Sequence, residues 1–177
     1  MKRLRTTKQL TLSCPPIDEI PKPKLRIMFQ NVQSLRKHFE EVKSNKEFQS
    51  ADVLLFCETW LGEAGSSNDN FEIEGFKSPA KVQGWNDHRG LIAYSEFRFS
   101  VFPKIVNEDF ELMHIYIKSK QHNYSLILFY RATSSNNITR FLAEVKKIMQ
   151  NPQFQSNNFI LLGDANIKPS ANRSRSE

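Results

Sequence analysis

The stretch Phe159-Ile160-Leu161-Leu162-Gly163-Asp164-Ala165-Asn166 places the tightest constraint on the fold of this chain. Four apolar residues in a row, between polar Asn157-Asn158 and Gly163, predict a short strand that is buried on both faces. A buried strand holds the residues that follow it in a fixed place at one end of a sheet. Asp164 and Asn166 are two residues apart, so they point to the same side and converge on one ligand if the chain stays extended.

The composition is that of one soluble domain. The chain has 177 residues, of which 39% are hydrophobic and 25% charged, so it can form a real core and does not belong to the disordered class. The formal net charge of +6 favours a polyanionic partner such as nucleic acid, although much of the excess lies in the two terminal segments.

The cysteines and the N-terminus indicate a compartment. Cys14 and Cys57 have no metal-type spacing to other Cys or His residues, which predicts reduced thiols in an intracellular protein. Met1-Lys2-Arg3 is basic, but no apolar signal region follows it, and no run approaches the length of a membrane span. We expect a protein that is not secreted. The basic N-terminus serves nuclear import in one interpretation and is a solvated linker in the other.

Three segments are distinguishable along the chain. Residues 1–24 are basic, contain four prolines and have no apolar period, which predicts a linker or arm. The domain is expected over residues 25–167. Residues 168–177 are polar and aperiodic and are interpreted as a tail.

The first part of the domain has the order strand, helix, strand. Alternating apolar residues predict a strand from Leu25 to Asn31, and an i, i+4, i+7 pattern predicts a helix from Leu35 to about Asn45 with Ser34 as a candidate N-cap. The apolar run Val53–Cys57 predicts a second buried strand, which ends at Glu58. Asn31 and Glu58 therefore emerge at the carboxyl ends of strands, where α/β sheets form sites.

The second part predicts antiparallel strands and one more helix. Residues 61–84 are rich in Gly, Ser and Asn, and Ser66–Asn70 are expected to form an exposed loop. Short links between the next apolar runs predict hairpins. The strands expected here are Leu91–Tyr94, Phe97–Phe102, Leu112–Ile117 and Tyr124–Tyr130.

The clearest helical pattern of the sequence follows these strands. Apolar residues recur with helical spacing from Ile138 to Met149, after Asn136 or Asn137 as cap and before Pro152. The whole pattern predicts an α+β fold with two mixed sheets faced by helices. An apolar strand such as 159–162 needs neighbours on both edges, so we expect the fold to be incomplete at the C-terminus.

The polar residues at these strand ends occur in the order of a known set of motifs. Five stretches carry the likeness: Gln30–Leu35, Cys57–Leu61, Arg89–Tyr94, Tyr130–Asn136 and Gly163–Asn166. In them the chain resembles the endonuclease/exonuclease/phosphatase superfamily, whose members include deoxyribonuclease I and abasic-site endonucleases. The wording of the first and fourth stretches is most similar to endonuclease domains of transposable elements, either non-LTR retrotransposons or Helitron-type proteins. The resemblance implies a four-layer α/β sandwich of the deoxyribonuclease I-like type.

The resemblance also implies a metal-dependent phosphodiesterase that acts on nucleic acid, with DNA preferred to RNA as the expected partner. Glu58 would be the principal ligand of Mg²⁺ or Mn²⁺, and Asn31 would support that metal site. Gln33 stands where many relatives carry Asn or Asp, which removes a charge near the metal. Taken singly, Glu58 is more often a solvated strand-end residue and Asn31 a turn former, but their joint occurrence favours a site.

Four further residues would act on the phosphate and the water. By the resemblance, Asp164 would orient or deprotonate the attacking water, Asn166 would fix that water or the phosphate, and Tyr130 would hydrogen-bond a phosphate oxygen. Without the motif, Tyr130 is equally well explained as a core aromatic residue. Arg131 is a candidate phosphate contact, and a plain surface arginine is nearly as good an interpretation.

One family motif is absent from this sequence. The family ends with a Ser-Asp-His motif that supplies a catalytic histidine, and the chain stops before it. The four histidines, which all precede the fourth motif, are His38, His88, His114 and His122. We therefore expect a truncated domain with impaired activity. The alternatives are a catalytically inactive nucleic-acid-binding module, a non-functional transposon remnant, and a phosphoinositide or sphingomyelin phosphatase of the same superfamily.

Overall fold

The computed structural model describes residues 25–61, 70–118, 123–134, 137–154 and 158–166. The arm expected at residues 1–24, the tail at 168–177 and His122 lie outside these ranges. No helix within the described ranges is long and apolar enough to cross a membrane.

The first sheet is built from the N-terminal half of the domain. It contains β1 (Ile27–Asn31), β2 (Val53–Cys57), β3 (Ala80–Val82) and β4 (Leu91–Ser95), in the order β1-β2-β4-β3. β1 and β2 are parallel and are joined by helices α1 (Leu35–Ser44) and α2 (Lys46–Gln49), whereas β4 runs antiparallel to both of its neighbours.

The second sheet is built from the C-terminal half. It contains β5 (Phe99–Val106), β6 (Phe110–Lys118), β7 (Asn123–Arg131) and β8 (Asn158–Asp164), in that order. β5, β6 and β7 form an antiparallel meander with a register shift in β5. β8 is parallel to β7, and the crossover between them contains helix α3 (Ile138–Gln150) and a 3₁₀ turn at Pro152–Phe154.

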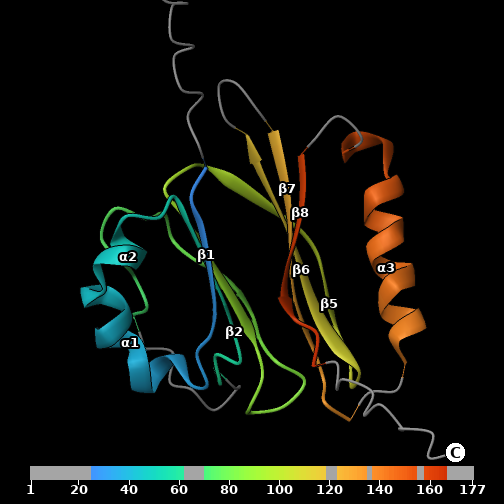
Figure 1. Ribbon diagram of the computed structural model, residues 1–177, viewed down its shortest axis with the longest axis horizontal. Helices are drawn as coiled ribbons and strands as arrows, with labels where there is room; N and C mark the ends of the chain where they lie inside the picture. Colours follow the sequence, from blue (N-terminus) through green and yellow to red (C-terminus); the bar gives the residue numbers. More distant parts are fainter. Residues whose placement is uncertain (1–24, 62–69, 119–122, 135–136, 155–157, 167–177) are drawn as a thin grey trace, which may run out of the picture.

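The two sheets pack face to face, with α1 and α2 outside the first sheet and α3 outside the second (Figure 1). Because strand residues alternate between faces, Leu55 and Leu128 point into the core between the sheets, while Leu54 packs beneath α1 and Phe129 beneath α3. These four layers, helix, sheet, sheet, helix, confirm the predicted α+β architecture.

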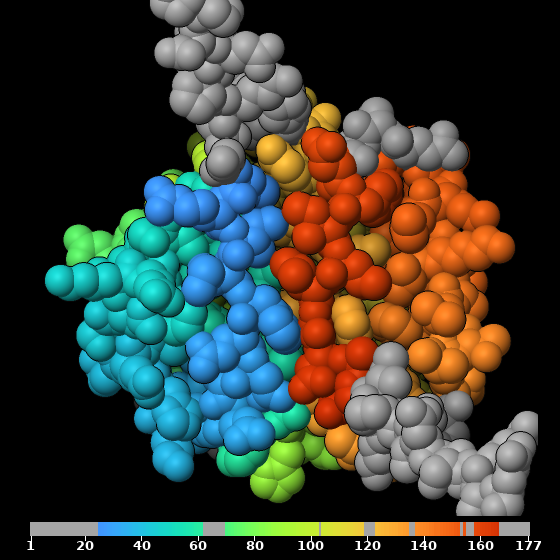
Figure 2. Space-filling view, viewed as in Figure 1, coloured from blue at the N-terminus to red at the C-terminus, as the bar shows by residue number. Residues whose placement is uncertain are grey.

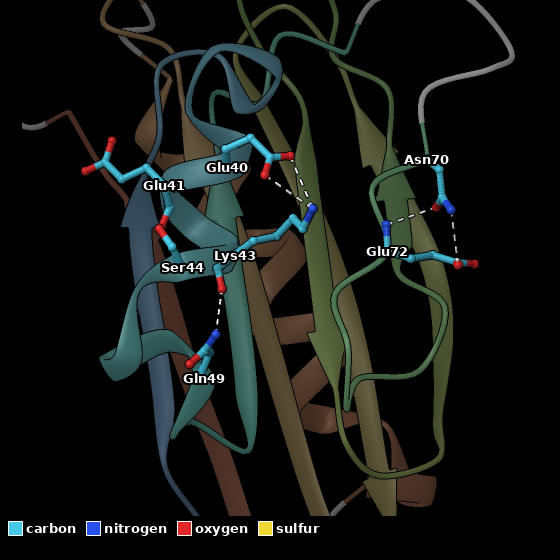
Figure 3. Close-up of polar contacts among 7 residues, drawn as sticks. All are labelled: Glu40, Glu41, Lys43, Ser44, Gln49, Asn70 and Glu72. Atoms are coloured by element: carbon cyan, nitrogen blue, oxygen red, sulfur yellow. Dashed lines mark hydrogen bonds and ion pairs between the residues drawn. The ribbon is translucent and has the colours of Figure 1, made fainter.

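Local polar contacts shape the helical layer over the first sheet. Asn45 caps α2, since its side-chain oxygen accepts from the backbone N–H of Glu47 at 2.8 Å. Gln49 in α2 donates to the Lys43 carbonyl at 2.7 Å, which ties α2 to the end of α1 (Figure 3). Ser34 precedes α1 but makes no side-chain capping bond, because its backbone, at φ 91°, leaves the usual N-cap geometry, so that expectation is wrong.

Most predicted elements are confirmed, including α3 with Asn137 as its cap, but one strand was not predicted and one connection differs. β3 lies in the stretch 61–84, where no strand was predicted, and most of the loop expected at 66–70 lies outside the described residues. The predicted hairpin between β4 and the next strand does not form, because β4 pairs with β2 and β3 while β5 pairs with β6. The chain passes from one sheet to the other between Ser95 and Phe99.

The strand at 159–162 forms as predicted, but it is not buried on both faces. Among the described strands, β8 pairs with β7 alone and lies at the edge of its sheet. Ile160 and Leu162 face the core between the sheets, whereas Leu161 is 47% exposed. Phe159 packs beneath α3, so Leu161 and the unpaired edge of β8 are the parts of this strand that the described residues leave exposed.

Candidate active site

The two parallel strand pairs end at the same edge of the molecule. Asn31 is the last residue of β1, and Asp164 is the last of β8. These strands belong to different sheets but lie side by side, blue against red in Figure 2. The side-chain nitrogen Nδ2 of Asn31 donates to Oδ2 of Asp164 at 3.0 Å. The structure therefore brings together two of the predicted site residues, Asn31 and Asp164, across the two sheets.

Gly163 sets the position of Asp164. A Cβ at residue 163 would lie 2.1 Å from the carbonyl oxygen of Phe129, so only glycine allows β8 to approach β7 this closely. The register then places Asp164 opposite Tyr130. The second carboxylate oxygen of Asp164, Oδ1, accepts from the backbone N–H of Asn166 at 3.0 Å.

Asn166 does not converge with Asp164 in the way that an extended chain would allow. The chain turns at Asn166, where φ is 46°, and the Asn166 side chain donates to the Arg131 carbonyl at 2.7 Å. Arg131 is only 8% exposed, and its guanidinium donates to the Ala165 carbonyl at 2.9 Å. Both side chains thus hold the turn that follows β8.

Glu58 follows β2 in a strained backbone conformation. Its φ is 51°, and its carbonyl accepts from the Ser34 N–H at 2.9 Å. Five described non-glycine residues have positive φ, and each follows β1, β2 or β8: Gln33, Ser34, Glu58, Trp60 and Asn166. Such conformations cost free energy and concentrate at functional sites. The strand ends where chemistry was predicted are also where the backbone is strained.

Tyr130 connects Glu58 to the second sheet. Burial raises the pKa of the Tyr130 hydroxyl to about 12, and the charge of Glu58 and a hydrogen bond to it add to the rise. The hydroxyl therefore stays protonated at neutral pH and donates to the Glu58 carboxylate. The guanidinium of Arg89 lies over the Tyr130 ring, 5.8 Å from its centroid.

A buried carboxylate that sequence reasoning missed lies beneath this group. Glu111 in β6 is fully buried, pairs with Tyr130 across the strands, and accepts backbone N–H bonds from Trp85 at 2.8 Å and Gly90 at 2.9 Å. Burial raises its pKa despite these two bonds. A single glutamate inside the apolar run 110–117 is the signal that would have found it.

Cys57 lies near the carboxylates of Asp164, Glu58 and Glu111. Burial raises the pKa of its thiol, and the negative charges of Asp164, Glu58 and Glu111 raise it further. The thiol is buried and free, which agrees with the predicted reduced state of Cys57.

The donor chemistry fits a hard divalent cation. Glu58, Asn31 and Asp164 offer carboxylate and amide oxygens, which Mg²⁺ prefers. Within the described ranges no group of three His, Cys, Asp or Glu side chains is arranged to hold a metal ion. A cation here would be held by one or two carboxylates and by water, as Mg²⁺ commonly is.

The three described histidines lie elsewhere. His38 contacts Glu41 on α1 at 3.3 Å, and His88 packs edge-on against Trp60. His114 is buried on the outer face of β6 beside Phe102 and Phe154. None of these three hydrogen-bonds to Glu58 or Asp164.

Comparisons with known proteins establish the fold. No protein-family model matches the sequence, and no curated protein matches it. Among solved structures, the chain is similar to the endonuclease domain of TRAS1, a telomere-specific non-LTR retrotransposon, with a TM-score of 0.58 and 14% identity over 82% of this chain and 61% of that one. It is also similar to the 3′ phosphatase NExo from Neisseria bound to a product DNA hairpin, with a TM-score of 0.57 and 15% identity over 83% and 60% of the two chains.

A third neighbour is TDP2 from D. rerio in complex with a single-strand DNA product, with a TM-score of 0.58 and 14% identity over 82% and 62% of the chains. This chain thus spans about 60% of the length of the structures it matches. All three share the deoxyribonuclease I-like fold of the endonuclease/exonuclease/phosphatase superfamily.

Proposed function

We propose that this chain, whose fold is deoxyribonuclease I-like, belongs to a metal-dependent phosphodiesterase that acts on nucleic acid. The observation that carries the proposal is the hydrogen bond between Asn31 and Asp164, which joins the ends of β1 and β8 across two sheets. Tyr130 hydrogen-bonds Glu58 and lies opposite Asp164, so the residues proposed for the metal and those proposed for the phosphate lie at one edge. The structural neighbours that act on DNA share this fold.

In the proposed reaction, Asp164 positions the attacking water and accepts its proton. Its oxygen Oδ2 is held by the Asn31 amide, and its oxygen Oδ1 is held by the Asn166 N–H. Two hydrogen bonds fix the plane of the Asp164 carboxylate. A proton acceptor that is already oriented is effective because no conformational entropy is lost in orienting it during the reaction. The Tyr130 hydroxyl donates to Glu58, and we propose that it turns to a phosphate oxygen when a cation occupies the Glu58 carboxylate.

Glu58 and Asn31 would hold the Mg²⁺ or Mn²⁺ ion. When bound, the cation would stabilise negative charge that develops on the phosphoryl oxygens. The proposed roles of Asn166 and Arg131 follow from their contacts, because both fix the turn beyond Asp164. We therefore propose them as positioning residues, with Arg131 no longer favoured as a direct phosphate ligand.

The preferred substrate is DNA, and the preferred origin is a mobile element. The similarity to the endonuclease domain of a non-LTR retrotransposon supports the origin, together with the motif wording at 30–35 and 130–136. We further propose that cleavage by this chain is slow, because none of the described histidines supplies an acid or base to the site. Loss of such a group typically costs about 10²–10⁴-fold in rate.

The test is nicking of supercoiled plasmid by the full chain in Mg²⁺, in Mn²⁺ and in excess chelator. Weak nicking is expected with either metal and none with chelator. Asp164→Asn should remove the nicking, while Lys147→Ala, a remote change in an exposed pair with Glu144 on α3, should leave it unchanged. Nicking that survives both the chelator and Asp164→Asn would end the proposal.

The second candidate is a nucleic-acid-binding module without turnover. The observation that favours it is the placement of the described histidines away from the site. It predicts binding that weakens as salt rises, with no nicking in any metal. The absence of binding at low salt would exclude both candidates.

A further inference from the structure

Two exposed tryptophans border the candidate site. Trp60 comes two residues after Glu58 and is 36% exposed, and Trp85 lies between β3 and β4 and is 57% exposed. They are the only two tryptophans in the sequence. An indole is among the largest apolar groups, and leaving two of them in water beside one site forgoes stabilisation that burial would give.

The loops that carry them form one unit, which we call the tryptophan rim, residues 58–60 and 84–90. Trp60 donates its backbone N–H to the Arg89 carbonyl at 3.0 Å, and Thr59 donates to Gly90 at 3.2 Å. Gly90 has φ +114°, and a Cβ there would lie 2.6 Å from Oγ1 of Thr59, so the two loops are in close contact.

Glu111 fastens the tryptophan rim to the second sheet. Its two carboxylate oxygens accept the backbone N–H groups of Trp85 and Gly90. Trp60 itself has φ 55°, a conformation that a bulky residue adopts only when its surroundings impose it. The indoles are therefore displayed on an ordered support, and little freedom is lost when a ligand stacks on them.

The rim adjoins the groups proposed to act on the phosphodiester. Glu111 pairs with Tyr130, and the Arg89 guanidinium lies 5.8 Å from the Tyr130 ring centroid. His88 packs edge-on against the Trp60 ring at 4.9 Å. A nucleotide chain whose phosphate sits at Glu58 and Asp164 would thus pass exposed aromatic faces and a cationic side chain within a short distance.

We propose that Trp60 and Trp85 stack on unpaired nucleobases that flank the phosphodiester at the site. This inference rests on the proposed function. Every base offers a π-face, so stacking tolerates any sequence, but bases inside a duplex are already stacked on each other. The tryptophan rim therefore selects single-stranded segments, or junctions between paired and unpaired nucleic acid, over continuous duplex.

The binding test uses the full chain in chelator at low salt, where no turnover occurs. Fluorescence anisotropy compares a labelled oligothymidylate with an abasic oligomer of equal length and charge. Stacking of one base predicts that Trp60→Ala and Trp85→Ala each weaken oligothymidylate binding by about 5- to 100-fold. Binding of the abasic oligomer should stay within about twofold, because phosphate contacts do not involve the indoles.

Two controls bracket the result. Leu142→Ala removes an apolar side chain that is 53% exposed on α3, outside the second sheet, and should change neither affinity. Trp60→Phe keeps an aromatic face and should retain most of the preference for bases. Circular dichroism of each variant confirms that the fold is intact.

Intrinsic fluorescence gives an independent readout because the chain has two tryptophans. Trp60→Phe leaves Trp85 as the reporter, and Trp85→Phe leaves Trp60. Each remaining indole should be quenched by oligothymidylate and not by the abasic oligomer.

The outcomes separate this inference from the function on which it rests. Equal binding of the two oligomers, or tryptophan variants that weaken both alike, overturns the stacking proposal and leaves the phosphodiesterase proposal standing. No binding of either oligomer also overturns the stacking proposal, while plasmid nicking in Mg²⁺ decides the phosphodiesterase proposal separately. Asp164→Asn should lose cleavage and keep the preference for bases, which shows that the rim acts in binding.

Discussion

A single glycine determines where Asp164 stands. Any side chain at residue 163 would meet the Phe129 carbonyl at 2.1 Å and the Phe129 ring at 2.6 Å, so β7 and β8 would have to separate. We expect Gly163→Ala to lower the free energy of unfolding by about 1–3 kcal/mol, as overpacking does. It should also displace Asp164 and reduce nicking. Urea denaturation and the plasmid assay measure the two effects.

Gly75→Ala is the matched control for that substitution. Gly75 has φ +87° but nothing within 4 Å of an added Cβ, so alanine there should cost only the backbone strain of about 1–2 kcal/mol and leave nicking unchanged. If Gly163→Ala nicked DNA as well as Gly75→Ala, the close approach would not control the site.

His114 makes the stability depend on pH. Burial lowers the pKa of His114 from 6.5 to about 4. Between these two pH values the imidazole is protonated in the unfolded chain and neutral in the folded chain. Stability is therefore lost as pH falls through this window, by about 2 kcal/mol at pH 5. The raised pKa of Glu111 acts with the opposite sign, because it lets the folded chain take up a proton more readily.

The measurement is the urea midpoint at pH 7 and pH 5 for the wild type and His114→Phe. The variant removes the titrating group among aromatic neighbours, so its midpoint should fall less between the two pH values. An identical fall in both proteins would show that His114 does not carry the effect.

At the scale of the element, β8 is an edge strand with an apolar outer face. Leu161 is half exposed, while Ile160 packs toward the core between the sheets. Leu161→Lys should change the free energy of unfolding by no more than about 0.5 kcal/mol and should reduce self-association, because a charge on an edge opposes strand pairing. Ile160→Ala should instead cost about 2 kcal/mol.

Sedimentation at increasing protein concentration, together with urea denaturation, tests this contrast. The prediction fails if Leu161→Lys unfolds the chain as strongly as Ile160→Ala does, since β8 would then be buried on both faces as its sequence suggested.

The sequence predicts the elements whose apolar residues recur with a regular spacing. It does not predict elements that are defined only by their hydrogen bonds to a neighbouring strand. α3 and β2 were predicted because helical spacing and an unbroken apolar run are local properties. β3 has three residues and no period of its own, so only its pairing with β4 defines it. The edge position of β8 was missed because burial depends on neighbours that the strand itself does not encode.

The candidate site divides in the same way. Asn31, Glu58, Tyr130 and Asp164 were predicted to lie at strand ends, and they do, because the ends of apolar runs are visible in a sequence. Glu111 was missed, since its role depends on a loop that returns from another sheet. The turn at Asn166 was missed because left-handed backbone at an asparagine has no local pattern here.

At the scale of the molecule, each sheet comes from one contiguous half of the domain. The first uses strands between Ile27 and Ser95, and the second uses strands between Phe99 and Asp164. Both sheets contribute side chains to the core between them, so the two halves should unfold together. A destabilising substitution in one half should therefore lower the stability of the other half as well. Leu128→Ala in the second sheet, at a fully buried position, should cost about 2–5 kcal/mol.

Both tryptophans lie in the first half, so their fluorescence reports on a half that the substitution leaves intact. The fluorescence midpoint in urea should nevertheless fall in Leu128→Ala, and it should coincide with the midpoint of the helical signal. Leu142→Ala, exposed in the same half as Leu128, is the control. Separate midpoints would mean that the halves unfold independently.

The hydrogen bond from Asn31 to Asp164 joins the two halves of the domain. Asn31 and Glu58 are contributed by one half, and Tyr130 and Asp164 by the other, while the chain crosses between them once, at residues 96–98. A cut in that crossing would leave two fragments, each with an incomplete set of polar groups. The proposed nicking would then return only when the two fragments reassociate, so the domain could be used as a split reporter of that association.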